Sequence, residues 1–296
     1  MRYIKSLLIT LVTWAALFGG IYYFYHRIYA PPGDAIGAAI VSFLMALGIG
    51  ALRQSRIDRM DAALLERAEG PPRHGERVAV AGTLEPTGAP LNAPFSGTQC
   101  VAYEYIVRHS KPSRRSGEQP TVIQDRMGIA LAPCVIKSNL REIKLLACPV
   151  IDDFPQTATD KARAAAYLAS APADDQSYGR VFLNWNESAH LFDDGTGGVR
   201  RDWILTHHND LENSSLIERA IPAGDKVCVI GNYSAEKNAI VPNTKGGGVR
   251  ILRGSRDEGL QKMRGARKGD FVIAAFLLAV PPLVAWGILT LANRPR

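Results

Sequence analysis

The sequence FVIAAFLLAVPPLVAWGILTL, Phe271–Leu291, is almost entirely apolar and contains no charged residue. A helix of about 20 apolar residues spans the hydrocarbon core of a bilayer. Two further apolar runs, Leu7–Tyr25 and Ala35–Leu52, lie near the N-terminus, so apolar segments bracket a polar middle. The pattern predicts three transmembrane helices and one soluble domain held close to the membrane.

The two N-terminal apolar runs are separated by the short link HRIYAPPGD. Its Pro31-Pro32-Gly33 is a turn signal that does not continue a helix, so the runs are expected to form a hairpin across the membrane. A cleaved signal peptide is the alternative for the first run. The length of that run, the absence of an A-x-A pattern after it and the second run all favour an uncleaved anchor.

The distribution of Lys and Arg around the apolar runs predicts the orientation, because cytoplasmic flanks carry the excess of positive charge. One side of the predicted membrane receives Arg2, Lys5, Arg53, Arg56, Arg59, Arg264, Arg267 and Lys268. The other side receives Arg27, Arg294 and Arg296. We therefore expect an inner- or plasma-membrane protein whose N-terminus and soluble domain face the cytoplasm, with the C-terminal tail outside.

Composition limits the classes of function. The net charge of +7 over 296 residues comes largely from basic residues that flank apolar runs, where anionic lipid head groups lie. We therefore predict a membrane partner and an unknown protein or lipid partner, but no nucleic acid. The four cysteines share no C-x-x-C spacing, so neither a disulfide framework nor a zinc site is predicted. They are expected to be buried thiols in a reducing compartment.

The middle of the chain carries strand patterns and one clear helix. The predicted helix is the Ala-rich segment Lys161–Ser170. Strands are predicted from alternating apolar and β-branched residues at Arg77–Leu84, Cys100–Arg108, Thr121–Pro133, Glu142–Pro149, Val181–Leu183, Arg201–Thr206, Lys226–Tyr233, Ala239–Pro242 and Val249–Leu252. The polar segment His109–Pro120 is expected to be an exposed hairpin loop. The fold class is therefore α+β, with a barrel-like or sandwich-like sheet.

The predicted boundaries divide the chain into four parts. Residues 1–53 form the transmembrane hairpin, and 54–70 form an amphipathic connector helix with an apolar stripe at Ile57, Met60, Leu64 and Leu65. Residues 71–255 form the β-rich domain. Residues 256–296 contain a basic helix and the C-terminal transmembrane helix.

An eight-residue pattern, G-[ED]-[RK]-V-x-V-x-G, occurs twice, at Gly75–Gly82 and Gly224–Gly231. Each copy is a turn, a charged pair and a strand that ends at a glycine, where a bend or bulge is permitted. Two equivalent strands that open two halves of a barrel-like sheet would explain the pattern. The alternative is a coincidence of strand chemistry.

Three segments together resemble a known family. Leu91–Gly97 followed by Cys100–Tyr105 resembles the PL-x-AP-x-SG-x-x-CV-x-Y signature of GIDE/MULAN-type proteins. Ile217–Asp225 leading into KVCVIGNY resembles the E-x-x-L-x-x-G-x-x-V-x-V-x-G segment of that family, with Ile221 in place of Leu. Val249–Leu252 resembles its closing strand. The resemblance covers about residues 70–255, the part known in the family as the BAM (beside a membrane) domain.

The resemblance implies membrane helices on both sides of this domain. The eukaryotic members are membrane E3 ubiquitin ligases implicated in organelle organisation, and their activity resides in a C-terminal RING that binds two zinc ions. Since no Cys follows Cys228 in the sequence given, the ligase chemistry is not carried over. The resemblance therefore indicates a RING-less relative.

Several groups of polar residues are candidates for a site. Neighbouring histidines in a strand point to opposite faces, so His207 and His208, with Asp210 and His190, are interpreted as polar strand-surface residues. Glu187–Gly195 lacks the ligand alternation of an EF-hand, and Gly246–Gly248 precedes no helix that would bind a phosphate. Cys100 is expected in the core, and Ser96 lacks the G-x-S-x-G context of a nucleophile. We therefore assign no catalytic, cofactor-binding or metal residues.

Three hypotheses for function follow. The first is a non-enzymatic, membrane-tethered binding or scaffold domain at the cytoplasmic face. The second is a component of a ubiquitin-related or membrane-stress pathway, by resemblance alone. The third is a hydrolase whose site is assembled from distant residues.

Overall fold

A computed structural model describes residues 17–23, 33–67, 72–112, 119–138, 141–149, 151, 153–175, 198–208, 210–241 and 249–292. The chain divides into two compact units. One unit comprises Met1–Ala63 with Leu260–Arg296, and the other comprises Leu64–Gly259.

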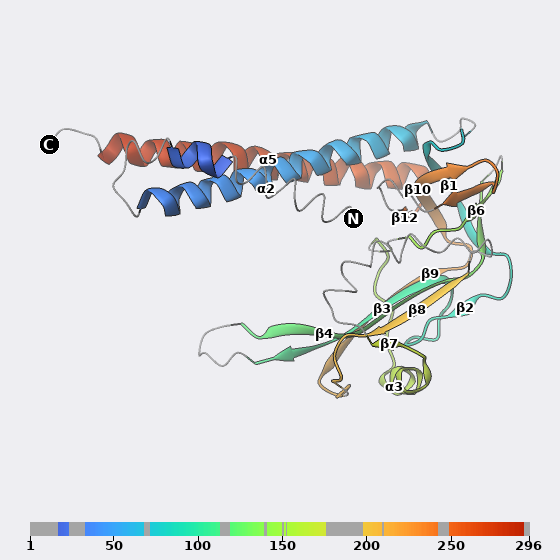
Figure 1. Cartoon of the computed structure of the whole chain (residues 1–296). Coiled ribbons are helices and arrows are strands. Elements are labelled where there is room, and N and C mark those ends of the chain that lie inside the picture. The colour runs from blue at the N-terminus through green and yellow to red at the C-terminus, as the bar shows by residue number, and fades with distance from the viewer. Residues whose placement is uncertain are drawn as a thin grey trace. The chain divides into compact units, whose positions relative to one another are not determined.

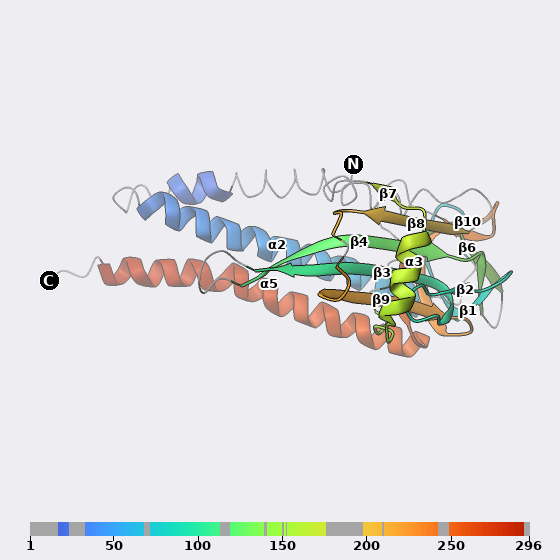
Figure 2. The same ribbon diagram turned by 90° about the horizontal axis from the view of Figure 1, so that it is seen from below.

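The first unit contains most of two long helices, α2 (Gly33–Glu66) and α5 (Arg256–Ala292), which lie side by side (Figures 1 and 2). They approach closely at Gly48, where an added Cβ would lie 2.8 Å from Cγ of Leu278. The single helix α5 confirms the predicted basic helix that continues into the last apolar run. Glycine at position 48 therefore permits the close approach of α2 and α5.

The three predicted membrane helices are not all shown. Among the described residues, the helical segment Ala39–Glu66 is long and apolar enough to cross a bilayer. The first predicted run, Leu7–Tyr25, is described only at 17–23, which is helical. The predicted connector stripe is wrong at Met60, which is 52% exposed. Leu65 of the stripe is fully buried and Ile57 and Leu64 are half-buried, while Asp58 and Asp61 are buried as well, so the inward face of this part of α2 is of mixed polarity.

The second unit contains a closed sheet, which confirms the barrel-like prediction. Its ring order is β1–β5–β6–β11–β10, and β10 pairs again with β1. A further strand, β12, pairs with residues 227–230 of β10, whereas β11 pairs with residues 232–234 of the same strand. The strands are β1 (Arg77–Pro86), β5 (Cys134–Lys137), β6 (Glu142–Leu145), β10 (Lys226–Ser234), β11 (Ala239–Val241) and β12 (Arg250–Arg253).

The two copies of the repeated pattern pair with each other, as neighbouring antiparallel strands. Val80 of β1 lies opposite Val229 of β10, and these residues hold the same place in the pattern. The flanking pairs are symmetric about this point: Val78–Gly231, Ala79–Ile230, Ala81–Cys228 and Gly82–Val227. The repeat therefore describes a local two-fold relation at the closure of the barrel.

The hydrogen bonds at both ends of this pair obey the same symmetry. The amide of Gly75 donates to the carbonyl of Tyr233, and the amide of Gly224 donates to the carbonyl of Leu84, both at 2.8 Å. Both glycines have positive φ, 77° and 81°, a conformation that other residues adopt at a cost. The first glycine of the pattern is thus required by the turn that begins each strand.

A second sheet has the order β2–β3–β4–β8–β7, and β9 pairs with β3. The short helix α3 (Lys161–Ser170) packs against it through Ala164 and Leu168 (Figures 1 and 2). Asp160 caps the helix by accepting hydrogen bonds from the amides of Ala162 and Arg163. The strands are β2 (Leu91–Asn92), β3 (Gln99–Lys111), β4 (Thr121–Leu131), β7 (Asp174–Asp175), β8 (Val199–Ile204) and β9 (Ser214–Pro222).

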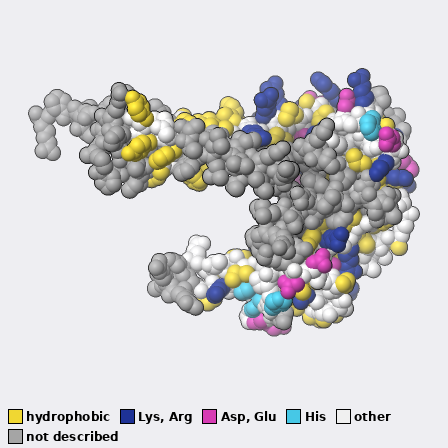
Figure 3. Space-filling view, viewed as in Figure 1, with side chains coloured by type: hydrophobic (Ala, Val, Ile, Leu, Met, Phe, Trp, Pro, Cys, Tyr) yellow, Lys and Arg dark blue, Asp and Glu magenta, His cyan; other side chains and the backbone are white. Residues whose placement is uncertain are grey.

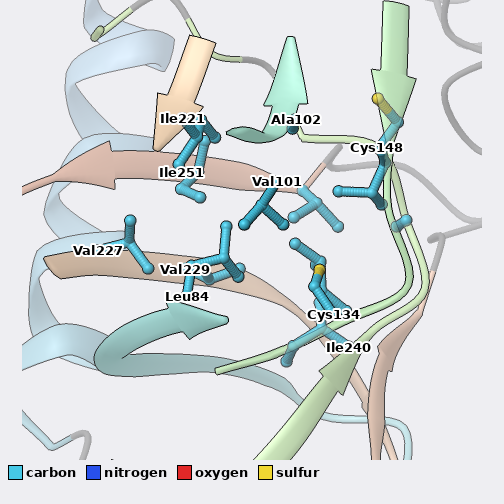
Figure 4. Close-up of a cluster of buried hydrophobic side chains, with 14 of the residues drawn as sticks. Leu84, Val101, Ala102, Cys134, Cys148, Ile221, Val227, Val229, Ile240 and Ile251 are labelled. Carbon is cyan, nitrogen blue, oxygen red and sulfur yellow. The ribbon is translucent and has the colours of Figure 1, made fainter. Parts of the chain in front are cut away.

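The two sheets share one hydrophobic core. Val101 and Ala102 of β3 and Ile221 of β9 lie together with Leu84 and Val229 of the barrel (Figure 4). Burial of these aliphatic side chains removes apolar surface from water and holds the sheets together.

Strand β9 was not predicted, because Glu218 and Arg219 interrupt its apolar alternation. Each charge has a partner: Glu218 accepts backbone hydrogen bonds, and Arg219 lies 2.8 Å from Glu104. Strands β2, β5 and β7 were also not predicted as separate strands. The predicted strand Val181–Leu183 lies outside the described residues.

Candidate functional site

The candidate site lies where the β3–β4 hairpin contains a β-bulge. Val107 pairs with Arg126 and Arg108 pairs with Gln124, so Asp125 is an extra residue in β4. A bulge re-aims side chains and occurs often beside functional sites. Here it directs the carboxylate of Asp125 towards His109 of β3.

The carboxylate of Asp125 is fully buried and has several partners. Its two oxygens lie 2.9 and 2.8 Å from Nδ1 of His109. The hydroxyl of Thr206 donates to Oδ1. The carbonyl oxygen of Asp125 accepts the amides of Leu205 (2.8 Å) and Thr206 (3.1 Å). Backbone and side chain are therefore both fixed, so the carboxylate is positioned in advance of any ligand.

His208 completes the cluster. Its ring stacks on that of His109, with centroids 3.9 Å apart and planes 23° from parallel. Its Nε2 is buried and has no hydrogen-bond partner among the residues that the structure describes. One ligand atom from each of His109, Asp125 and His208 lies within 4.8 Å of the other two. Figure 3 shows histidine and acidic side chains next to one another at the lower edge of the view.

Two imidazoles and a carboxylate at this spacing can hold a divalent ion. They can also act as a buried aspartate–histidine ion pair with a second imidazole stacked against it. Both arrangements place the polar atoms of three chain segments, β3, β4 and the segment after β8, at one point.

The histidines considered from sequence separate in the structure. His207 is largely exposed, and its Nε2 lies 3.2 Å from the carboxylate of Asp175. Both His207 and His208 follow the end of β8, so their interpretation as strand-surface residues is wrong. His190, Glu187–Gly195 and Gly246–Gly248 lie outside the described residues.

Asp210 is part of a turn rather than of the cluster. Its carboxylate accepts hydrogen bonds from the amides of Glu212 and Asn213 and from the side-chain amide of Asn213. The hydrogen bonds from Asn213 lower the pKa of Asp210. These contacts shape the segment that leads from His208 into β9.

Cys100 and Ser96, each considered from sequence as a nucleophile, are both held by local structure in the fold. Cys100 is fully buried, and burial, followed by the charge of Glu218, raises its pKa to about 12. The hydroxyl of Ser96 lies 2.9 Å from that of Thr98 within the same turn. A thiolate at Cys100 is therefore strongly disfavoured at neutral pH.

We expect the four thiols to be unreactive in the folded protein. All four are buried and free, and burial raises the pKa of Cys100, Cys134 and Cys148 to about 12. Titration with a thiol reagent at pH 8 should detect almost none without denaturant and four with it. Because these pKa values are raised in the folded state, stability should fall as pH rises above about 9, where unfolded thiols ionise. Rapid native-state labelling of several thiols would contradict this burial.

The two longest family-like segments meet in the structure, although they are 123 residues apart at their closest contact. The carboxylate of Glu218 accepts the amides of Phe95 (2.6 Å) and Ser96 (3.1 Å) and the hydroxyl of Thr157 (2.7 Å). Glu218 is fully buried. The Glu of one segment therefore holds the Pro-Phe-Ser-Gly turn of the other, which is a structural role.

A third buried carboxylate, Asp202 of β8, joins α3 to the sheet. It accepts hydrogen bonds from the hydroxyls of Tyr105 (2.6 Å) and Tyr167 (2.8 Å) and from Nε of Arg200 (3.1 Å). Burial is the main cause that raises the pKa of both tyrosines. This network is satisfied internally, and it is a structural rather than a ligand-binding group.

No protein-family model matches the chain, and neither a curated protein nor a solved structure shows significant similarity to it. The relation to GIDE/MULAN-type proteins therefore remains a prediction from the quoted motifs. The candidate site rests on geometry alone. Sequence reasoning missed His109 and Asp125 because it assigned His109 to a polar loop and because a bulge is not visible in the strand pattern.

Proposed function

We propose that this chain is a membrane-anchored, non-enzymatic binding protein. Helices α2 and α5 and the N-terminal apolar run hold it in the bilayer, as three membrane spans. The β-rich domain faces the cytoplasm, and the cluster of His109, Asp125 and His208 is its binding site.

The observation that carries the membrane anchor is the exposure of large apolar side chains on two helices. Of the twelve large hydrophobic residues that are exposed in the described part, nine lie in two short helical segments. They are Ile40, Phe43, Leu47, Ile49 and Leu52 on α2 and Phe271, Val272, Ile273 and Phe276 on α5. A soluble monomer rarely exposes so many large apolar side chains within two short segments, whereas lipid tails accept them.

The packing between the two helices supports the same proposal. Small residues are buried on both helices, Ala46 and Gly48 on α2 and Ala274 on α5, and Gly48 lies against Leu277 and Leu278. Helices in membranes associate through such small residues, because these let the backbones approach closely. The apolar surface of α2 ends at Leu52, directly before exposed Arg53 and Arg56, as at a membrane boundary.

The proposed orientation is tested with single cysteines on either side of the membrane. Because the four native thiols are buried, the background labelling of the folded protein is expected to be low. Gln119→Cys places a thiol at an exposed position of the β-rich domain, and Arg296→Cys places one at the C-terminal tail. In intact cells, a membrane-impermeant maleimide should label Arg296→Cys but not Gln119→Cys. Inverted vesicles should reverse the result.

Two outcomes would contradict the proposal. Labelling of Gln119→Cys in intact cells would invert the orientation. Equal labelling of both variants in both preparations would show that no membrane separates the two positions. The matched control is the unmodified chain, which should give little signal in either preparation.

A further inference from the structure

We infer that His109, Asp125 and His208 bind one divalent ion of the late first transition series, such as Zn²⁺ or Co²⁺. This deepens the proposed function by naming the ligand of its binding site. It does not depend on the membrane anchor, so the two proposals fail separately.

The donor atoms favour this class of ion. Two imidazole nitrogens and one carboxylate oxygen suit zinc, cobalt, nickel, copper and iron, whereas Mg²⁺ and Ca²⁺ prefer sets made of oxygen alone. The cluster lies in a chain whose cysteines are all buried elsewhere in the fold, so thiolates do not contribute to it. These residues therefore do not form a thiolate site for a soft metal such as Cu⁺.

The spacing of the donors fits an ion after small side-chain movements. Zinc bonds to nitrogen and oxygen are about 2.0–2.2 Å long, so tetrahedral ligands lie roughly 3.3 Å apart. The ligand atoms of the three residues already lie within 4.8 Å of one another, and His109 and Asp125 are 2.8 Å apart. To bind the ion, His109 and Asp125 would separate from 2.8 Å to about 3.3 Å, and the stacked imidazoles would turn one nitrogen each towards the shared point.

The surroundings of Asp125 resemble the outer shell of a metal ligand. The hydroxyl of Thr206 donates to Oδ1, and Oδ2 lies 2.8 Å from Nδ1 of His109. A hydrogen bond of this kind orients a ligating carboxylate and tunes its affinity. Two backbone amides fix the carbonyl of the same residue, which keeps the bulge in place.

His208 distinguishes a metal site from a simple ion pair. An ion pair between His109 and Asp125 needs no third residue, yet His208 is stacked on His109, and its buried Nε2 has no hydrogen-bond partner in the part of the chain that the structure describes. A buried polar nitrogen without a partner costs free energy, and coordination to an ion would satisfy it. The unpartnered nitrogen, the carboxylate and the second imidazole thus point to one shared ligand.

The number of protein ligands distinguishes structural zinc sites from sites that also bind a molecule from solvent. Structural zinc sites have four protein ligands, whereas sites with three keep a position for a molecule from solvent. The ion would join β3, β4 and the segment after β8, and it would present at least one open position. The site is therefore of the open type.

The test uses the purified full chain in detergent, without a histidine tag, after removal of metal by a chelator. Zn²⁺ and Co²⁺ are added, excess is removed by desalting, and bound metal is measured by mass spectrometry. We expect one equivalent of either ion, no retention of Mg²⁺, and visible d–d absorption in the Co²⁺ form. Binding affinity is measured by competition with a chromophoric chelator.

Two neighbouring histidines provide a matched pair of variants. His208→Ala should weaken binding at least tenfold, whereas His207→Ala should leave it unchanged because His207 is exposed and pairs with Asp175. Asp125→Asn tests the carboxylate, and Thr206→Val should weaken affinity by about 10–100-fold while keeping the stoichiometry at saturation. Thermal unfolding of each variant shows whether it is folded, and His208→Ala decides the question if Asp125→Asn is not.

Three results would overturn the inference. The first is that the folded wild-type chain retains neither Zn²⁺ nor Co²⁺, which would leave only an ion pair. The second is that His207→Ala and His208→Ala lose equal affinity for the metal. The third is that the wild-type chain retains Mg²⁺ as well as Zn²⁺. Metal binding by a chain that does not enter membranes would uphold the metal site and defeat the anchor. A chain that enters membranes but binds neither Zn²⁺ nor Co²⁺ would contradict the metal site and leave the membrane anchor standing.

Discussion

Replacement of Glu218 by Ala is expected to lower the free energy of unfolding by about 3–5 kcal/mol. The carboxylate is fully buried and accepts two backbone amides, those of Phe95 and Ser96, and one hydroxyl, that of Thr157. Alanine would leave all three donors without this acceptor inside the fold. The midpoint of thermal unfolding, followed by tryptophan fluorescence in detergent, should fall by roughly 6–20 °C.

The matched control for this variant is Glu142→Ala. The side chain of Glu142 is 64% exposed and lies 4.0 Å from Nζ of Lys137, an exposed ion pair. Such pairs contribute about 0–1 kcal/mol, so the control should shift the midpoint by little. Similar shifts for the two variants would show that the Glu218 carboxylate does not hold the Pro-Phe-Ser-Gly turn.

The second large effect is expected at Gly82, in β1 of the barrel. A Cβ at this position would lie 2.3 Å from the carbonyl oxygen of Lys137 in the neighbouring strand β5. Because the obstacle is the backbone of Lys137, relief requires β1 and β5 to move apart within the barrel. Gly82→Ala should therefore destabilise the domain by about 2–4 kcal/mol, at the upper end of overpacking effects.

Gly88→Ala is the control for Gly82→Ala. No atom lies within 4 Å of a Cβ built at Gly88, which is exposed in the turn after β1. We expect a change within about 0.5 kcal/mol, which is usual for surface substitutions. Equal effects of the two substitutions would mean that the close approach of β1 and β5 does not occur in solution.

The barrel was partly predictable because its pattern is local. Alternation at Arg77–Leu84 and Lys226–Tyr233 predicts strands, and the repeated glycines indicate that these strands are equivalent. The pairing of Val80 with Val229 gives this repeat its physical meaning. Strand β9 was missed because its charges are compensated by partners far away in sequence, and single-strand patterns carry no information about such partners.

The candidate site was not predictable for a related reason. His109 and Asp125 meet across a hairpin whose register is shifted by one residue, and His208 reaches them from a third segment. A sequence pattern locates none of these contacts. The sequence does suggest His207 and His208 as candidate metal ligands, but of the two only His208 belongs to the cluster.

The central claim is that lipid is the solvent for α2 and α5. The direct test is to collect membranes from cells that produce the full chain, wash them with alkaline carbonate and centrifuge at high speed. We expect the chain to remain in the pellet after the wash and to enter the supernatant only when detergent is added. Recovery of the folded chain in the supernatant without detergent would contradict the proposed anchor.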